Sequence, residues 1–481
     1  MDIGFVWALD WLLGFILIGC AIGESIELIE LLAWKRGDEK PPINPSAQRP
    51  FVSFHVPICS EPPDIVAKTL LALRDLDYEA FEVVIVDNNT SDERLWQPIE
   101  RLCQELGSRF RFFHLPRWPG FKAGALDFAL EHIAPETSLI AVVDADYQIT
   151  PNYLREIIGY FDDQRVAFVQ TPQDYRDWSH NAFFRACNWE YWQVFAVSMV
   201  LRNQRNAILM HGTMSVVRRE ALERVGGWAQ WCLTEDSELG LRILALGYQS
   251  IYVWKTYGRG LVPFTFGDYK RQRRRWVIGG VQQLKRHFRL FLPQPRNGPH
   301  LTNIQKLYFL QGWLPWARCS VIIVSIPLAL ATGAAALFGG LGEHAWSLLG
   351  IGMTLVLAQL LLRQLVIYRH HLALSWRDTA GATIANFSLV WAVGCGWLSG
   401  LTAMQQVFQR TPKRPQARTN WLRAARAEIV IGMLALAVGV ALMVTRGLQP
   451  WEIECGLFSY AMLLLPAAWM ARQSARAAPS P

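Results

Sequence analysis

Asp144 and Asp146 are the residues best suited to bind a metal ion. They follow the apolar run 139–143, at the point where a strand is expected to end in a loop. Carboxylate oxygens suit Mg²⁺ or Mn²⁺, ions that keep bound water and share the oxygens of a substrate diphosphate. An Asp-x-Asp triplet is common by chance, and its position after an apolar strand is what favours a metal site here.

A second acidic motif, Thr234-Glu235-Asp236, begins a predicted helix that stops at Gly247. Acidic residues in a first helical turn also complement the helix dipole, which is the ordinary structural alternative. In the functional interpretation Asp236, with Glu235 beside it, is a general base that takes a proton from an attacking hydroxyl.

Basic and aromatic residues complete the candidate site. Gln272, Arg275 and Trp276 fit a QxxRW pattern, in which the arginine offsets charge on a departing diphosphate and the tryptophan stacks on a sugar ring. A basic segment anchored by tryptophan at a lipid surface is the alternative, and both interpretations can hold together. Lys122 precedes a predicted helix, where it can hold phosphate or simply be a solvated lysine.

A sheet is expected to position these residues. Between residues 50 and 260, short β-branched runs alternate with helical patterns. The expected strands are 51–57, 81–87, 110–115, 139–144 and 166–171, and the helices between them include 63–75, 94–106 and 122–133. This alternation predicts a mainly parallel sheet covered by helices, with ligands at the carboxyl ends of the strands. Glu61, Asp87 and Asp144 follow three of these strands, and their convergence favours a ligand site over separate turn residues.

The two ends of the chain are expected to lie in lipid. Hydrophobic residues make up 52% of the sequence and are concentrated before residue 34 and after about residue 312. Five spans are predicted, at 3–22, 313–338, 346–367, 428–446 and 453–471, and Asp10 is an awkward inclusion in the first. Lys35 and Arg36 place the N-terminus outside and the next domain in the cytoplasm.

The apolar run 378–406 is harder to assign. If it crossed the membrane, the basic residues from Arg410 to Arg418 would fall outside, against the positive-inside rule. We therefore expect this run to lie in the cytoplasmic interface or to be re-entrant, which leaves the C-terminus inside.

Charge and cysteine content narrow the possible classes of protein. The net charge is +7, and much of it lies in the clusters 271–286 and 410–426. Beside lipid-length helices, such clusters favour anionic headgroups or a diphosphate over nucleic acid. The eight cysteines include no CxxC pair, which indicates buried thiols in a reducing cytosol rather than a zinc site.

In these motifs the chain resembles the inverting, processive, membrane-embedded family-2 glycosyltransferases, the group of cellulose synthase, hyaluronan synthase and bacterial β-glucan synthases. The resemblance covers roughly residues 50–415, and the order DxD, TED and QxxRW at these separations is specific. It implies an α/β GT-A fold, a UDP-sugar donor and either Mg²⁺ or Mn²⁺ on Asp144 and Asp146. It also implies UDP-sugar-binding residues, namely Pro57, Glu61, Asp87, Lys122, Asp144, Gln272, Arg275 and Trp276.

Two further segments are similar to functional parts of this family. His211, Gly212 and Thr213 stand where the family contacts its acceptor, a role that Trp276 would share. The segment from Phe408 through Thr411 to Lys413 is similar to the FxVTxK gating loop of cellulose synthase, with Arg410 in place of valine. Ser60 and Asp127 stand where many members have asparagine, departures that bear on donor contacts.

The resemblance implies a synthase that polymerises glucose from UDP-glucose into a β-glucan, of β-1,3 or related linkage, and moves the growing glucan across a bacterial inner membrane. Its expected partners are the bilayer and accessory export subunits, with no nucleic acid. The expected domains are a membrane helix at 1–34 and a cytoplasmic glycosyltransferase domain at 36–300. An interfacial segment with two membrane helices is expected at 301–375, an interfacial helix with the gating-like loop at 376–427, and two membrane helices with a short cytoplasmic tail at 428–481.

Two other hypotheses remain open from the sequence. A non-processive transferase that adds one sugar to a lipid would share the donor chemistry but need neither QxxRW nor a gating-like loop. A non-catalytic scaffold or transporter is disfavoured because Asp146 and Asp236 are both present.

Overall fold

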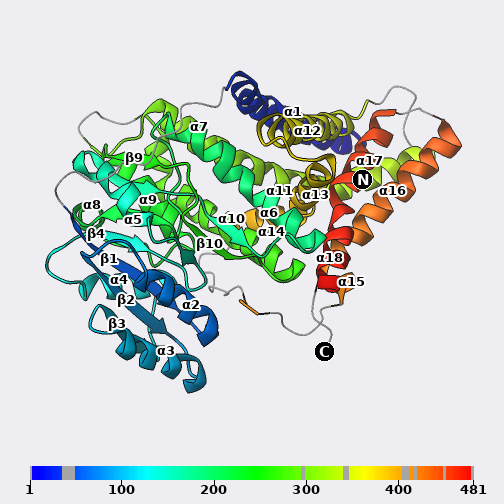
Figure 1. Cartoon of the computed structure of the whole chain (residues 1–481). Helices are drawn as coiled ribbons and strands as arrows, with labels where there is room; N and C mark the ends of the chain where they lie inside the picture. Colours follow the sequence, from blue (N-terminus) through cyan, green and yellow to red (C-terminus); the bar gives the residue numbers. More distant parts are fainter. Residues whose placement is uncertain are drawn as a thin grey trace.

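The chain folds into an α/β part and a bundle of long apolar helices (Figure 1). The computed structural model describes residues 3–34, 49–293, 298–339, 346–402, 412–414, 420–447 and 451–477. Of the gating-like segment, Phe408 and Thr411 lie outside the described residues, and Lys413 lies within them.

A seven-stranded sheet forms the centre of the α/β part, in the order β3-β2-β1-β4-β8-β6-β9. The five predicted strands are confirmed as β1 (Phe51–Ile58), β2 (Phe81–Asn88), β3 (Phe110–Leu115), β4 (Thr137–Val142) and β6 (Val166–Gln170). β1 pairs in parallel with β2 and β4, and β2 pairs in parallel with β3. β8 (Ser215–Arg218) runs antiparallel between β4 and β6, and β9 (Gln249–Tyr252) is parallel to β6. The sheet is therefore mixed and mainly parallel.

Helices cover both faces of this sheet, as the continuous apolar run 83–86 of β2 requires. Val83 and Ile85 pack in one core with α2 (Pro63–Arg74) and α3 (Glu93–Leu106). Val84 and Val86 point the other way and pack against α4 (Phe121–Glu131). The alternation of side chains along the strand thus sends successive residues into opposite cores.

Six described helical segments are long and apolar enough to cross a membrane. Five of them overlap the predicted spans: α1 (Ile3–Ala33), α11 (Asn303–Leu337), α12 (Leu348–Leu365) with its continuation to His371, α16 (Arg426–Arg446), and the pair α17 (Trp451–Leu464) and α18 (Pro466–Ala477). The protein is thus a multi-pass membrane protein with an α/β domain attached.

The sixth segment, Trp376–Thr402, is the run that the charge pattern assigned to the interface. It consists of α13 (Trp376–Phe387) and α14 (Val390–Thr402), with a break between them. α13 packs against α6 (Ala182–Gln193), and α14 packs against both α10 (Phe266–His287) and α11. Length and hydropathy alone therefore allow six spans, whereas the sequence analysis predicts five. These two criteria take no account of how α13 and α14 pack on helices of the α/β domain. The interfacial position stays a prediction.

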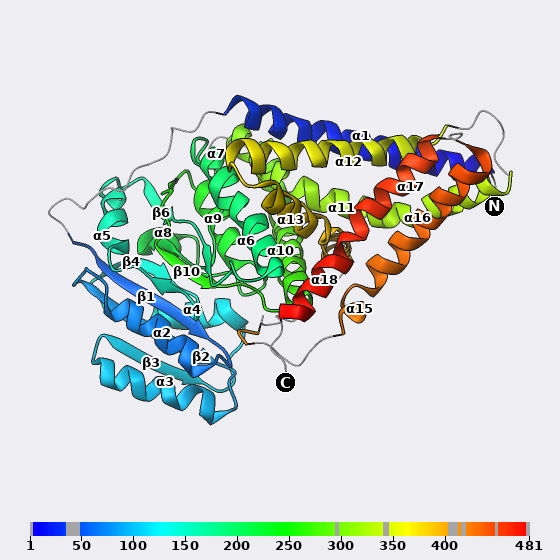
Figure 2. The ribbon, with the colours of Figure 1, turned by 45° about the vertical axis from the view of Figure 1, so that its right-hand side comes forward.

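α1 lies along α11 and α12 (Figure 2). Buried polar side chains connect it to both neighbours. Asp10 Oδ1 accepts a hydrogen bond from Ser347 Oγ at 2.8 Å, so this carboxylate within a predicted span has a polar partner at the start of α12. Farther along α1, Glu24 forms a buried ion pair with Arg318 of α11. Paired charges of this kind are the usual way in which a membrane bundle accommodates ionisable side chains.

Candidate active site

The carboxyl ends of β1 and β4 open onto a cavity of about 640 Å³. Most of the predicted site residues line it although they come from distant segments: Pro57, Glu61, Lys122, Asp144, Asp146, His211, Gly212, Glu235, Asp236, Gln272, Arg275, Trp276 and Lys413. The same cavity is lined by Phe309, Trp313 and Trp316 of α11, a helix of membrane-spanning length. A single chamber therefore joins the edge of the sheet to the bundle.

Lys122 links the two acidic motifs. Its Nζ donates to Asp144 Oδ1 at 2.7 Å and to the Gly212 carbonyl at 2.8 Å, and it lies 3.8 Å from Glu235 Oε1. Burial alone would lower the pKa of Lys122, but the negative charges of Asp144, Glu235 and Asp236 outweigh burial and raise it. The ammonium is therefore charged, as a phosphate-binding group must be.

Asp146 is held ionised in the wall of the cavity. The residue is 1% exposed. Burial opposes ionisation, but the Lys413 ammonium, 2.7 Å from Oδ1, and the Leu261 N–H, 2.8 Å from Oδ2, lower the pKa of Asp146 below its usual range. Asp146 is therefore ionised and already paired, so a metal ion would have to compete with the Lys413 ammonium for this carboxylate.

The pair Asp144 and Asp146 fits a hard divalent cation. Both carboxylates already draw an ammonium group to within 2.7 Å, from Lys122 and Lys413 respectively. Their donors are oxygens only, the set that Mg²⁺ and Mn²⁺ prefer. Within the described part of the chain, no group of three or more His, Cys, Asp and Glu side chains converges as a metal site. The remaining ligands would therefore have to come from water and from a substrate.

Asp236 lies against Gly212. Any side chain at position 212 would displace Asp236 or Lys122. A Cβ at Gly212 would lie 3.0 Å from Asp236 Oδ2 and 2.8 Å from Lys122 Nζ. Asp236 Oδ1 accepts from the N–H of Ser237 at 2.8 Å, which orients the carboxylate in the first turn of α9 (Glu235–Ala245). The base candidate is thus fixed at the point where the DxD, HGT and TED segments meet.

The carboxyl of Glu235 binds its proton more tightly than an ordinary glutamate does. Burial raises its pKa to about 7, with the charge of Asp236 adding to the rise and Lys122 opposing it. Near neutral pH, both the neutral and the ionised form of the Glu235 carboxyl are therefore populated.

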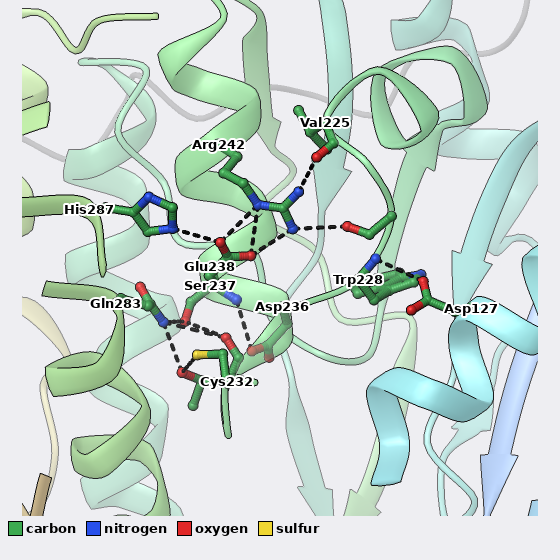
Figure 3. A network of polar contacts seen from close by, with 12 residues as sticks. Asp127, Val225, Trp228, Cys232, Asp236, Ser237, Glu238, Arg242, Gln283 and His287 are labelled. Atoms are coloured by element: carbon green, nitrogen blue, oxygen red, sulfur yellow. Dashed lines mark hydrogen bonds and ion pairs between the residues drawn. The ribbon is translucent and has the colours of Figure 1, made fainter. Parts of the chain in front are cut away.

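α9 is bonded directly to α10, so the TED and QxxRW motifs are positioned together (Figure 3). Gln283 Nε2 donates to Thr234 Oγ1 at 2.8 Å and to Ser237 Oγ at 2.6 Å. Behind them, Glu238 Oε1 lies 2.7 Å from His287 Nε2 and also accepts from Arg242 Nε at 2.8 Å. These contacts keep the two helices in one register.

Sequence reasoning missed Gln283, Glu238 and His287. A helical-face pattern would have revealed the first, because Gln272, Trp276 and Gln283 recur at the spacing of one side of a helix and all line the cavity. No comparable signal marks the contact between Glu238 and His287, because these two residues lie on different helices.

The indole of Trp276 is held between neighbouring side chains. The Arg273 guanidinium lies 4.3 Å from the centre of the Trp276 ring, and the Tyr191 ring lies 5.8 Å from it. Arg273 is itself paired with Glu190 in a buried contact. Trp276 therefore has a defined orientation in the cavity wall.

Two predicted site residues lie behind the wall rather than in it. Asp87 is 1% exposed and is bonded to Thr90 Oγ1 at 2.6 Å and to His114 Nδ1 at 2.7 Å, while its neighbour Asn88 lines the cavity. Thr213 is also buried, and its hydroxyl accepts from the Asp144 N–H at 3.0 Å. The predicted contacts of Asp87 with the UDP-sugar and of Thr213 with an acceptor remain predictions, since the structure shows both residues as supports of lining residues.

Residues 139–395, just over half of the chain, match the glycosyl transferase family group 2. The chain belongs to this family. This group 2 glycosyltransferase has 27% identity over 321 residues to a cellulose synthase catalytic subunit [UDP-forming] of Xanthomonas axonopodis pv. citri (strain 306), covering 64% of the chain and 42% of that protein. It has 24% identity over 295 residues to probable glucomannan 4-beta-mannosyltransferase 7 of Oryza sativa subsp. japonica, covering 58% and 50%. The chain thus spans half or less of the length of these relatives.

A solved structure supports the GT-A fold. The group 2 glycosyltransferase superposes on a mannosyltransferase from Pyrobaculum calidifontis, determined in complex with GDP-Man and Mn²⁺, with a TM-score of 0.53 and 20% identity. The match covers 81% of this chain and 99% of that one. The likeness confirms the predicted α/β architecture.

Proposed function

We propose that the protein is an inverting, processive glycosyltransferase that polymerises glucose from UDP-glucose into a β-glucan. The observation that carries this proposal is the shared cavity, which is lined both by Asp144, Asp146 and Asp236 and by Trp313 and Trp316 of a membrane-length helix. Donor chemistry and an apolar, aromatic exit toward the bundle thus occupy one chamber.

The donor diphosphate would bind beside Lys122, whose ammonium is kept charged by the surrounding carboxylates. Asp144 and Asp146 would hold Mg²⁺ or Mn²⁺, which when bound neutralises charge on the diphosphate. Arg275, on the same wall of α10, offsets the charge that develops as UDP departs.

Asp236 would take the proton from the acceptor hydroxyl. The freed oxygen attacks the anomeric carbon on the face opposite UDP, the bond from that carbon to the diphosphate oxygen breaks, and the configuration inverts to β. His211 and Gly212 border this point and would contact the acceptor. The ring of Trp276, fixed by Arg273, supplies a surface on which a pyranose can stack.

Processivity is supported by the aromatic residues beyond Trp276. Trp313 and Trp316 line the same cavity from α11 and offer further stacking surfaces toward the membrane. After each transfer, the extended glucan would therefore stay bound to these rings, with its new terminal hydroxyl ready for the next reaction at Asp236. The protein would operate at a bacterial inner membrane with its α/β domain in the cytoplasm, and accessory export subunits are compatible with this arrangement.

The test is incubation of the purified protein with UDP-glucose, UDP-GlcNAc, UDP-GlcA or GDP-mannose in the presence of Mg²⁺ or Mn²⁺. Release of the nucleoside diphosphate is measured, and the product is digested with β-1,3- and β-1,4-specific glucanases. We expect a glucanase-sensitive polymer from UDP-glucose. A single radiolabelled sugar in the lipid phase with no polymer would overturn processivity, and turnover of GDP-mannose alone would overturn the donor assignment.

A further inference from the structure

A second cavity, of about 510 Å³, lies outside the active site. It is bounded by α10, α14, α15 (Trp421–Ala424) and α16, all elements at or next to the helical bundle. Its lining combines charged and apolar residues: Lys270, Trp391, Arg423, Ala424, Arg426, Ala427, Glu428, Val430 and Ile431. None of these residues belongs to the site described above.

The cavity carries an excess of positive charge. Glu428 is buried and is neutralised by Lys270, whose Nζ lies 2.7 Å from Glu428 Oε1. Arg423 and Arg426 are exposed, and neither has an ion-pair partner among the residues that the structure describes. Two guanidinium groups are therefore available to an anion, and a planar guanidinium matches phosphate oxygens with paired hydrogen bonds.

The cavity continues into an apolar surface on α16. Val430, which lines the cavity, is 59% exposed, and Met433 and Leu434 are 51% and 48% exposed. Met433 and Leu434 lie three and four residues after Val430, so the three side chains share one face of the helix and form a stripe along it. Of the six candidate spans, α16 has the least buried window, at 28%. Its stripe is therefore suited to contact acyl chains.

We propose that this cavity binds the headgroup of an anionic phospholipid whose acyl chains lie along α16. Arg423 and Arg426 pair with the phosphate, and the half-buried Trp391 lines the same cavity, as expected of a tryptophan at the boundary between headgroup and hydrocarbon. Basic pockets at the ends of membrane helices select anionic lipids by the same electrostatics. A free phosphate satisfies the arginines but leaves the apolar stripe uncovered, which is why a lipid is the better occupant.

The lipid site is connected to the active site through α10. Lys270 lies two residues before Gln272 on that helix, and α10 packs along α14, which contributes Trp391 to the lipid site. An occupied site would hold this end of α10, and with it Trp276, in place. The proposed binding of the lipid does not depend on the proposed function. The proposed effect of the lipid on turnover does depend on that function.

The experiment uses the full-length protein in nanodiscs of phosphatidylcholine, with or without phosphatidylglycerol. Retained lipid is counted by native mass spectrometry after release into detergent, and apparent melting temperature is recorded. We expect retention of phosphatidylglycerol over phosphatidylcholine, reduced about fivefold by Arg426→Gln and further by the Arg423→Gln, Arg426→Gln double variant.

Arg446→Gln is the matched control, because Arg446 is also exposed and stands at the opposite end of α16. We expect it to retain phosphatidylglycerol as the wild type does. Equal retention of the two lipids by the wild type, or an equal loss in Arg446→Gln, would overturn the proposal. So would stabilisation by inorganic phosphate in pure phosphatidylcholine discs that matches the effect of phosphatidylglycerol. Unchanged melting profiles of the variants in pure phosphatidylcholine exclude misfolding as the cause.

If lipid retention follows these expectations, UDP release from UDP-glucose should be faster in discs that contain phosphatidylglycerol. That increase should be lost in Arg426→Gln and kept in Arg446→Gln. Selective lipid retention without any turnover in the wild type would count against the proposed function and leave the lipid site in place.

Discussion

Lys413 Nζ lies 2.7 Å from Asp146 Oδ1, although the two residues are 267 positions apart in the chain. Burial alone would lower the pKa of Lys413, but the charges of Asp146, Glu61 and Asp144 outweigh burial and raise it. The lysine is therefore a cation placed directly on a carboxylate that we assign to the metal. The described end of the gating-like segment thus meets the donor side of the cavity.

Replacement of Asp146 by asparagine should weaken the binding of UDP in the presence of Mg²⁺. The change removes a proposed metal ligand and leaves the Lys413 ammonium without its closest carboxylate. We expect a loss of at least about tenfold, the lower end of what even outer-shell changes cost at metal sites. Isothermal titration with and without a chelator measures it. Asp177→Asn, at a carboxylate that is 71% exposed, is the control, and equal affinities for both variants with and without chelator would refute the metal assignment.

Asp236→Asn should abolish sugar transfer while UDP still binds. An amide cannot accept the hydroxyl proton, yet it preserves the shape that fits against Gly212. General base catalysis typically contributes about 10²- to 10⁴-fold, which sets the expected fall in turnover. Initial rates of UDP release and the UDP dissociation constant are measured side by side. A variant that makes polymer at the wild-type rate would exclude Asp236 as the base.

The stability contribution of Glu235 should depend on pH. Burial raises its pKa from 4.5 to about 7, so between these values the folded protein holds a proton that the unfolded chain has lost. The folded state is therefore favoured most below pH 4.5, and this advantage is lost as pH rises through about 7. Relative to Glu235→Gln, which does not titrate, the apparent melting temperature of the wild type should fall across this range. A difference that stays constant with pH would contradict the raised pKa.

Gln283→Met should impair catalysis more than donor binding. The methionine fills similar space but cannot donate to Thr234 Oγ1 and Ser237 Oγ, the contacts that hold α9 to α10. Loss of buried hydrogen bonds of this kind costs about 1–3 kcal/mol, so a fall in kcat of about tenfold is expected with little change in UDP affinity. Gln104→Met, at an exposed position on α3, controls for the substitution itself. Equal losses in kcat and UDP affinity would indicate a general structural role instead.

Arg318→Met should destabilise the bundle strongly because it leaves Glu24 buried without its partner. Breaking a buried ion pair from one side typically costs about 3–5 kcal/mol, whereas replacing both partners by uncharged residues is often close to neutral. The double variant Glu24→Gln, Arg318→Met should therefore recover most of the lost thermal stability in detergent. Additive losses in the double variant would show that the two side chains do not act as a pair.

Local features of the chain determined much of this protein without the structure. Strands such as 81–87 were predictable because apolar, β-branched runs closed by turn formers depend on neighbours in the sequence. The approach of Asp144 and Asp146 to Glu61 could also be predicted, since β1 and β4 are parallel and end at one edge of the sheet, whereas Asp236, in the first turn of α9, was expected there only from the resemblance.

Only the tertiary structure decided how these residues bear on one another. It placed Asp87 behind the wall of the cavity, joined Gln283 to the TED motif, and put Trp313 of α11 in the same chamber as Asp236. It also inserted the antiparallel strand β8 between β4 and β6, and it packed α13 against α6 and α14 against α10 and α11. Each of these depends on contacts between residues far apart in the chain, and hydrophobic period, charge and turn chemistry are properties of short windows that carry no information about such contacts.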